Sequence, residues 1–217
     1  MKQLLILGPK GGVGKTTLAR NLAVAAARAG LSVGTMDLDG QGTLDQWCNY
    51  RPEHQPPVIS YTHSYMALDE KGIRKIPGLD LLVIDTPASV EFNLKALGAL
   101  IKYADYIVIP SGVRGEEMDS LRGVLEMLRT QRTARYCVVF NGVKPKQIEA
   151  VTAQSALAMV PDIDLAPIPI QELAEVYRTY DAGLGILDLK EARTTEAFEK
   201  LWTLVADRLG LAAEVAA

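Results

Sequence analysis

The feature that most constrains the fold is a glycine-rich segment at residues 10–17, KGGVGKTT, which lies between a short apolar run and a long helical pattern. The apolar run at residues 3–7 is typical of a buried strand, and the pattern from about 14 to 29 is typical of a helix that ends at Gly30. Glycines let several backbone N–H groups converge on one anion, and a helix N-terminus adds about half a positive charge. Strand, loop and helix in this order predict a phosphate-binding loop, or P-loop.

Each residue type in this loop suits a nucleoside triphosphate with Mg²⁺. We expect Lys15 to reach the β- and γ-phosphates, the Thr16 hydroxyl to ligate Mg²⁺ and Thr17 to contact the α-phosphate. The strict pattern GxxxxGK[ST] begins with glycine, whereas this chain has Pro9 there. The residues expected to hold the nucleotide are Gly11, Gly12, Val13, Gly14, Lys15, Thr16 and Thr17.

The rest of the chain alternates short apolar runs with longer helical stretches, which predicts an α/β fold: a single P-loop domain over residues 1–217 with a mostly parallel, doubly wound sheet flanked by helices. The apolar runs are continuous, as in strands buried on both faces. The least regular stretch is 50–77, and the last few residues are expected to fray. Strands are predicted at 3–7, 31–36, 80–84, 106–109, 136–140 and near 165–168, and helices at about 14–29, 89–103, 116–132, 145–159, 171–182 and 194–209.

Three aspartates follow predicted strands. Asp37 and Asp39 lie two residues apart, so their side chains point the same way at the carboxyl end of the sheet, where such folds bind ligands. Asp85 ends the apolar run 81–84, about 70 residues after the loop. Capping of a loop is the alternative role for Asp37 and Asp39.

The loop KGGVGKTT resembles the deviant Walker A motif of the ParA/MinD ATPases, whose signature lysine is matched by Lys10. The resemblance implies a homodimer in the ATP state that encloses two ATP molecules, with Lys10 reaching the partner's phosphates. The segment at 37–41, DLDGQ, is similar to the switch I sequence DxDPQ, with Gly40 in place of proline. By this resemblance Asp39 orients the attacking water and Asp37 supports the Mg²⁺ shell. The run ending at Asp85 resembles Walker B, followed by switch II at 86–89. This resemblance implies that Asp85 holds Mg²⁺ through water, in keeping with the preference of Mg²⁺ for hard oxygen ligands.

The same resemblance places the adenine base near the ends of later strands. Asn141 stands where the family commonly contacts adenine, although an Asn-Gly turn is nearly as good an explanation for it. Residues 167–171 are expected to border the base, and Gln171 and Glu172 replace an arginine that the family often carries there. The length is closest to small ParF-like partition proteins, but this chain has only one of their several prolines after the fourth strand, Pro110.

The function that these features favour is a ParA-type ATPase that partitions a plasmid or chromosome, or positions a protein cargo. We expect slow hydrolysis stimulated by a ParB-like or other small partner, nonspecific DNA binding, and a cytoplasmic, nucleoid-associated location. The net charge is −3, so DNA binding must come from a local basic patch. Its candidate residues, each of which is otherwise a solvated surface charge, are Lys144, Lys146, Arg178, Lys190 and Arg193.

Three other functions are less well supported by the sequence. A MinD-like membrane ATPase needs a basic amphipathic C-terminal helix, but the tail at 200–217 has only Lys200 and Arg208 as cations and favours core packing instead. A metal-cluster relative needs paired cysteines, but Cys48 and Cys137 lie far apart and fit a reduced cytosolic protein. A small-molecule kinase needs an acceptor site that no motif indicates. No apolar run approaches the roughly 18 residues of a transmembrane helix.

Overall fold

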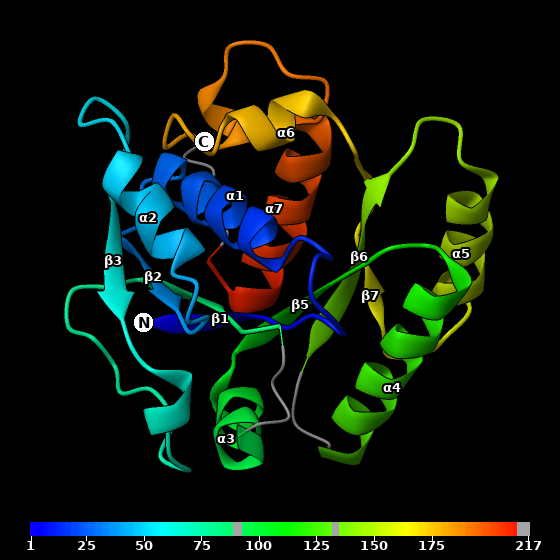
Figure 1. The fold of residues 1–217 in the computed structure, drawn as a ribbon, viewed down its shortest axis with the longest axis horizontal. Coiled ribbons are helices and arrows are strands. Elements are labelled where there is room, and N and C mark those ends of the chain that lie inside the picture. The colour runs from blue at the N-terminus through cyan, green and yellow to red at the C-terminus, as the bar shows by residue number, and fades with distance from the viewer. Residues whose placement is uncertain (89–92, 132–134, 212–217) are drawn as a thin grey trace.

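The fold is built on one parallel β-sheet, shown by a computed structural model that describes residues 1–88, 93–131 and 135–211 (Figure 1). The strand order is β3-β2-β4-β1-β5-β6-β7, with β8 paired to β6. Every pairing is parallel, so each connection crosses from one end of the sheet to the other. The strands are β1 (Lys2–Ile6), β2 (Val33–Asp37), β3 (Val58–Thr62), β4 (Leu81–Asp85), β5 (Tyr106–Ser111), β6 (Tyr136–Val143), β7 (Asp164–Leu165) and β8 (Ile170–Gln171).

Helices cover both faces of the sheet, which confirms the predicted doubly wound α/β fold. One apolar core joins the sheet to α1, α2, α6 and α7, and a second joins its other face to α3, α4 and α5. Figure 1 shows α1 and α7 on one side of the strands and α3 on the other. The helices are α1 (Lys15–Arg28), α2 (Thr43–Tyr50), α3 (Leu94–Tyr103), α4 (Gly115–Gln131), α5 (Ile148–Ala158), α6 (Ala174–Arg178) and α7 (Thr195–Leu209), with 3₁₀ turns at Tyr65–Ala67 and Ile186–Asp188.

Strand β1 shows why the apolar runs are continuous. Leu4 and Ile6 belong to the core beneath α1, whereas Leu5 and Leu7 belong to the opposite core, because successive side chains of a strand point to opposite faces. All four are fully buried. The continuous apolar pattern therefore reports burial on both faces, as expected for a parallel sheet.

The sheet register brings two of the predicted functional aspartates together. In the pairing of β2 with β4, Asp37 lies opposite Asp85, and in the pairing of β1 with β4, Asp85 lies opposite Ile6. The glycine-rich loop follows β1 directly. Both carboxylates therefore lie at the carboxyl ends of the strands, on the same side of the sheet as the glycine-rich loop.

The stretch 50–77, which we predicted to be irregular, contains part of α2 and all of β3. Helix α2 begins at Thr43 because the Asp37 carboxylate, from the preceding strand, accepts the N–H groups of Leu44 and Asp45 at 2.8 and 3.3 Å. Strand β3 pairs only with β2, so it is an edge strand. The β-branched and aromatic residues of β3 favour a strand, but the prolines next to them favour a loop, and the strand was therefore not predicted.

The helix predicted at 171–182 was too long, because α6 covers only Ala174–Arg178. The Arg20 guanidinium on α1 donates to the Val176 carbonyl, and so does the Thr179 hydroxyl. The N–H of Tyr180, which would donate to this carbonyl in a continuing helix, donates instead to the Tyr177 carbonyl. A contact from another element thus ends the helix.

Arg20 joins α1 to the whole segment around α6. Only 2% of it is exposed, and it also donates to the Thr179 hydroxyl at 2.8 Å and to the Leu184 carbonyl at 3.0 Å. Burial lowers its pKa to about 10. These oxygen acceptors fix α6 relative to the P-loop helix.

The C-terminal helix α7 packs into the core as predicted, through residues that include Phe198, Leu201 and Leu209. Across the described ranges no helix is both long enough and apolar enough to cross a bilayer. Helix α3 begins after Asn93, whose side chain accepts the Ala96 N–H at 3.0 Å. The predicted helix start at Ser89, the helix end at Arg132, the last residue of switch II and the fraying tail lie outside the described residues.

Candidate nucleotide-binding site

The glycine-rich loop has the backbone conformation that its sequence predicts. Gly12 and Gly14 have φ angles of 77° and 91°, in the left-handed region that favours glycine. Gly14 immediately precedes α1, and a Cβ atom there would lie 2.1 Å from the Asn141 Nδ2. A side chain at position 14 would therefore displace Asn141 and strain the start of the helix.

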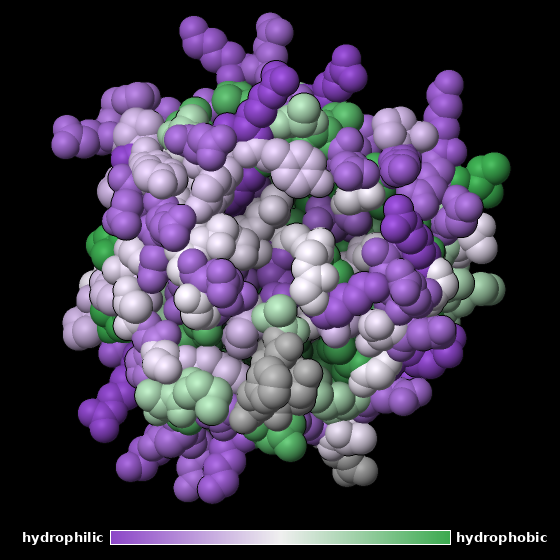
Figure 2. Space-filling view, viewed as in Figure 1, coloured by the Kyte–Doolittle hydropathy of each residue, from purple (hydrophilic) through white to green (hydrophobic). Residues whose placement is uncertain are grey.

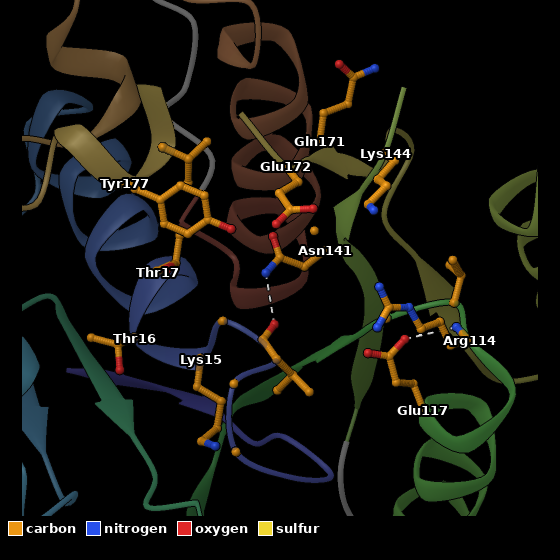
Figure 3. A pocket seen from close by; sticks show the side chains of 18 of the residues that line it. Lys15, Thr16, Thr17, Arg114, Glu117, Asn141, Lys144, Gln171, Glu172 and Tyr177 are labelled. Atoms are coloured by element: carbon orange, nitrogen blue, oxygen red, sulfur yellow. Dashed lines mark hydrogen bonds between the residues drawn. The ribbon is translucent and has the colours of Figure 1, made fainter. Parts of the chain in front are cut away.

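Asn141 supports the loop from β6. Its Nδ2 donates to the Val13 carbonyl at 2.9 Å (Figure 3), at a point where the pairing of β6 with β8 is irregular. In the described chain its Oδ1 makes no hydrogen bond. The contact with adenine stays a prediction, and the geometry limits it to this oxygen as long as the Val13 bond is kept.

Lys15 lies inside the loop that it follows. It is 7% exposed, and its Nζ donates to the Lys10 carbonyl at 3.2 Å. Burial lowers the pKa of Lys15, while the charges of Asp85 and Asp39 act in the opposite direction. A half-desolvated ammonium beside converging N–H groups is suited to bind phosphate oxygens.

Thr16 and Asp85 form a paired set of oxygens next to Lys15. The Thr16 hydroxyl donates to Asp85 Oδ2 at 2.5 Å. Asp85 is 1% exposed, and its other oxygen, Oδ1, is buried without a hydrogen-bond partner. Burial raises the pKa of Asp85 to about 7, with the Thr16 bond opposing and the negative charge of Asp37 adding to the rise.

This unsatisfied carboxylate fits a Mg²⁺ site. A buried oxygen without a partner is costly, and a hard cation with its bound water satisfies it. Within the described ranges no three His, Cys, Asp or Glu residues gather into a complete metal cage. Thr16 and Asp85 alone suit Mg²⁺, which commonly keeps several waters and takes further oxygens from a phosphate chain.

Asp37 and Asp39 differ in their surroundings. Asp37 is 3% exposed, and its oxygens accept the N–H groups of Asp39, Leu44 and Asp45. This is the capping role that the sequence left open, so any part of Asp37 in the Mg²⁺ shell must use its remaining lone pairs. Asp39 accepts the Gln41 N–H at 3.1 Å and faces the cavity beside the loop.

Lys10 is the first residue of the glycine-rich loop and is partly exposed. Its side chain is 36% exposed, and its Nζ lies 3.8 Å from the Glu116 carboxylate at the start of α4. The Glu116 side chain is itself 77% exposed. Solvent-exposed pairs of this kind contribute about 0–1 kcal/mol, so the contact does not fix Lys10.

The glycine-rich loop, Lys15, Thr16, Asp39 and Asn141 line a cavity of about 450 Å³. One end is the loop with Asp39, and the other is formed by Gln171, Glu172 and Tyr177, as Figure 3 shows for the labelled side chains. The side wall includes Arg114, whose N–H donates to the Glu117 carboxylate at 2.9 Å. No sequence motif singles out Arg114, Glu117 or Tyr177 as a site residue. The first two could have been found, because the segment after β5 ends beside the loop at the same sheet edge.

A comparison with known proteins decides the family. Residues 4–185 match the CobQ/CobB/MinD/ParA nucleotide binding domain. The chain belongs to this family. It is therefore a P-loop nucleotide-binding protein of the ParA/MinD type, as the glycine-rich loop predicted. The resemblance to the ParF-like subgroup stays a prediction.

Similar proteins include a relative in sequence and two in structure. The maintenance of carboxysome distribution protein A of Gloeobacter kilaueensis is 31% identical over 153 residues, which are 70% of this chain and 68% of that protein. A putative plasmid partition protein from Borrelia burgdorferi bound to AMPPNP has a TM-score of 0.71 at 19% identity, covering 95% of this chain and 99% of that one. The pNOB8 ParA bound to nonspecific DNA has a TM-score of 0.62 at 15% identity, covering 96% and 98%. The two structural likenesses show the ParA/MinD fold.

The predicted DNA-contacting residues of this ParA/MinD chain do not form one cluster in the structure. Lys144 lines the nucleotide cavity, whereas Arg178 and Arg193 line a separate cavity of about 590 Å³ beside α6. Lys146 and Lys190 are exposed. None of the five makes an ion pair within the described ranges. On the face seen in Figure 2 hydrophilic side chains predominate, and apolar ones are scattered.

The two cysteines have structural surroundings. Cys137 is fully buried, and Cys48 lies 3.2 Å from the Thr35 hydroxyl. Burial raises the pKa of Cys48 to about 11 and that of Cys137 to about 12. Thiols of this kind are poor metal ligands and nucleophiles, in agreement with the packing role expected for them.

Proposed function

We propose that this chain is a ParA-like ATPase that binds ATP with Mg²⁺, dimerises in the ATP state and positions a cargo on nonspecific DNA. The observation that carries the proposal is that Lys15 and Thr16 line a cavity walled by the glycine-rich loop, with the Thr16 hydroxyl bonded to the buried Asp85 carboxylate. This set combines a cation for the phosphates with a hydroxyl and a carboxylate for the metal.

The residues have distinct tasks in the proposed reaction. Lys15 and the loop N–H groups hold the phosphate chain, and Thr16 and Asp85 hold the Mg²⁺, which when bound neutralises charge on the phosphates. Asp39, which lines the cavity next to the loop, orients the attacking water. Because most of the remaining catalysis is electrostatic, the protein alone hydrolyses ATP slowly, and a partner protein accelerates it.

Lys10 is the residue proposed to act on the neighbouring subunit. Its contact with Glu116 is long and exposed, so its ammonium can move to a partner's phosphates at little cost. A cation supplied across an interface makes dimerisation depend on bound ATP. That dependence is what turns the nucleotide into a switch for DNA binding.

The names of the similar proteins support a positioning role. They include a carboxysome distribution protein, plasmid-partitioning proteins and a chromosome-partitioning ATPase. A structural neighbour is described as bound to nonspecific DNA. We infer that this chain acts in the cytoplasm on the nucleoid, with DNA contacts drawn from Lys144, Lys146, Arg178, Lys190 and Arg193, and that its cargo is a plasmid, a chromosome or a protein assembly.

The test compares the oligomeric state with DNA binding for the same samples. Light scattering should give a monomer without nucleotide and a dimer with ATP and Mg²⁺, and fluorescence anisotropy with a random-sequence duplex should report binding only in the ATP sample. Binding at about 50 mM salt should weaken by orders of magnitude towards 200 mM if several phosphates are contacted.

The informative variant is Lys10→Ala, and its matched control is Lys95→Ala on α3, an exposed lysine outside the cavity. Lys10→Ala should bind ATP but remain monomeric and fail to bind DNA, whereas Lys95→Ala should behave like the wild type. A Lys10→Ala protein that dimerises normally with ATP would overturn the proposed role of this residue. Wild-type dimers that form with ATP but do not bind DNA would overturn the proposal that the cargo is positioned on DNA.

A further inference from the structure

A second cavity of about 450 Å³ lies at the carboxyl ends of β2, β3 and β4, which are neighbours in the sheet. Its walls are the segments that follow these three strands, whereas the nucleotide cavity is built mainly on the segments after β1, β5 and β6. Asp39 lines both cavities and therefore stands between them. We call the second one the acidic cavity, because Asp37, Asp39 and Asp45 line it.

The negative charge of the acidic cavity is not neutralised by the protein. Its described lining residues include no lysine or arginine, and none of its three aspartates forms an ion pair with another described residue. Asp45 accepts hydrogen bonds only from neutral hydroxyls, those of Ser60 and Thr62. Burial raises the pKa of Asp37, and the charge of Asp45 adds to the rise. A cation that enters this cavity is therefore attracted by carboxylates that have no other counter-charge.

The fitting cation is larger than a metal ion. In the parts of the chain that the structure describes, no three His, Cys, Asp or Glu residues gather closely enough to hold a metal. Apolar groups also line the cavity, among them Leu38, Tyr65 and Pro87, and Met66 is 68% exposed beside them. The side chain of a lysine or arginine suits this mixture, because it carries its charge on an apolar stem.

Strand β3 leads into the acidic cavity and has a free outer edge. Its last residue, Thr62, lines the cavity, and within the described ranges its backbone bonds only to β2, so that it borders the sheet in Figure 1. Edge strands present unpaired N–H and C=O groups and are usually guarded by charged residues or proline. The strand VISYT has neither, and its Ile59 is 48% exposed. This edge can therefore accept an extended segment of another protein.

We propose that an extended basic segment of a partner protein pairs with the outer edge of β3 and places a lysine or arginine side chain in the acidic cavity. The main-chain bonds hold the segment in register, and Asp39 and Asp45 select the cation. Because Asp39 is also the residue proposed to orient the attacking water, a cation on its outer side restrains its carboxylate and raises the turnover of ATP. This coupling rests on the proposed ATPase function, whereas the docking does not.

The first test measures the binding of short fluorescein-labelled peptides to the nucleotide-free protein by fluorescence anisotropy. The probe peptides alternate valine with threonine and end in arginine or in citrulline, which has the same shape without the charge. A third probe ends in arginine but has methylated backbone N–H groups. The first peptide should bind about 10-fold or more tightly than either of the others, because they lose a hydrogen bond between charged groups or several backbone bonds.

Each comparison can overturn one part of the proposal. Equal affinity for the arginine and citrulline peptides overturns the role of the acidic cavity. Equal affinity for the methylated peptide overturns the pairing with β3. If none of the three peptides binds, the docking site itself is overturned.

The informative variant is Asp45→Asn, which removes one charge, keeps an oxygen for the Ser60 and Thr62 hydroxyls, and lies outside the nucleotide cavity. It should weaken binding of the arginine peptide by about 10-fold and leave binding of the citrulline peptide unchanged. Asp119→Asn, an exposed aspartate of α4 outside both cavities, is the matched control and should bind like the wild type. Unchanged binding in Asp45→Asn, or an equal loss for both peptides, overturns the selection of charge by this cavity.

The second test measures ATP turnover with Mg²⁺ in the presence and absence of the arginine peptide. The peptide should raise turnover several-fold in the wild type and have little effect on Asp45→Asn, whose basal rate should match that of the wild type. A wild type that binds the peptide but hydrolyses no ATP contradicts the proposed function and leaves the docking site standing. Turnover that is the same with and without bound peptide overturns the coupling through Asp39.

Discussion

Replacing Asp85 with asparagine should stabilise the nucleotide-free protein while weakening its ability to hold Mg²⁺. Asp85 is 1% exposed, and burial raises its pKa from 3.8 to about 7. Asparagine has nearly the same shape, and its oxygen can still accept the Thr16 hydroxyl, which lies 2.5 Å from Asp85 Oδ2. The substitution therefore removes a buried charge and keeps the hydrogen bond.

The magnitude follows from proton linkage. Between pH 4 and 7 the unfolded chain has lost the Asp85 proton while the folded chain still binds it, so the stability of the wild type falls as the pH rises through this range. The rise in pKa corresponds to roughly 4 kcal/mol of lost stability at pH values above 7. The asparagine variant has no such term. Its advantage in free energy of unfolding should grow by roughly 3 kcal/mol between pH 4.5 and 8.5.

The assay is urea unfolding without nucleotide and with a chelator, followed by the fluorescence of the buried Trp47. Both proteins are measured at several pH values, and Mg²⁺-dependent binding of AMPPNP is measured in parallel. An advantage of Asp85→Asn that does not change with pH would refute the idea that a buried charge is responsible. Unchanged Mg²⁺ dependence would refute the assignment of the metal site.

Three further substitutions test neighbouring residues. Lys15→Ala should abolish binding of ATP in calorimetry, because the loop loses its buried cation; near-normal affinity would contradict the loop assignment. Asp39→Ala should still bind ATP and should accumulate as a dimer in light scattering, because the attacking water loses its orienting group; a monomer with ATP would argue against that role. Asp37→Ala should lower the free energy of unfolding by roughly 3 kcal/mol in urea titrations, since three backbone N–H groups lose a charged acceptor; a loss below about 1 kcal/mol would show that α2 does not depend on this cap.

The sequence predicted those parts of the site that are formed by consecutive residues. Strand β1, the glycine-rich loop and α1 follow one another without interruption, so their physical roles can be deduced locally. Asp85 was found because an apolar strand in a parallel sheet ends at the same edge as the loop. In each case one local pattern and one general rule of α/β folds were sufficient.

The parts that it missed depend on contacts between distant segments. The start of α2 is capped by Asp37, six residues before the helix and on another element, so no local cap announces it. Helix α6 is short because Arg20 occupies a carbonyl that would otherwise continue it. Tyr177 enters the cavity through this same arrangement, so its position could not be deduced from spacing alone.

The contacts of Arg20 also restrict how this protein can be recombined with its relatives. The guanidinium on α1 needs the oxygens of Val176, Thr179 and Leu184, and those oxygens need a donor from α1. A chimera in which a new C-terminal third does not place these oxygens against α1 would leave the buried Arg20 cation without acceptors and lose several kcal/mol. The P-loop helix and residues 176–184 are therefore coupled through Arg20. In a chimera these two segments should be exchanged together.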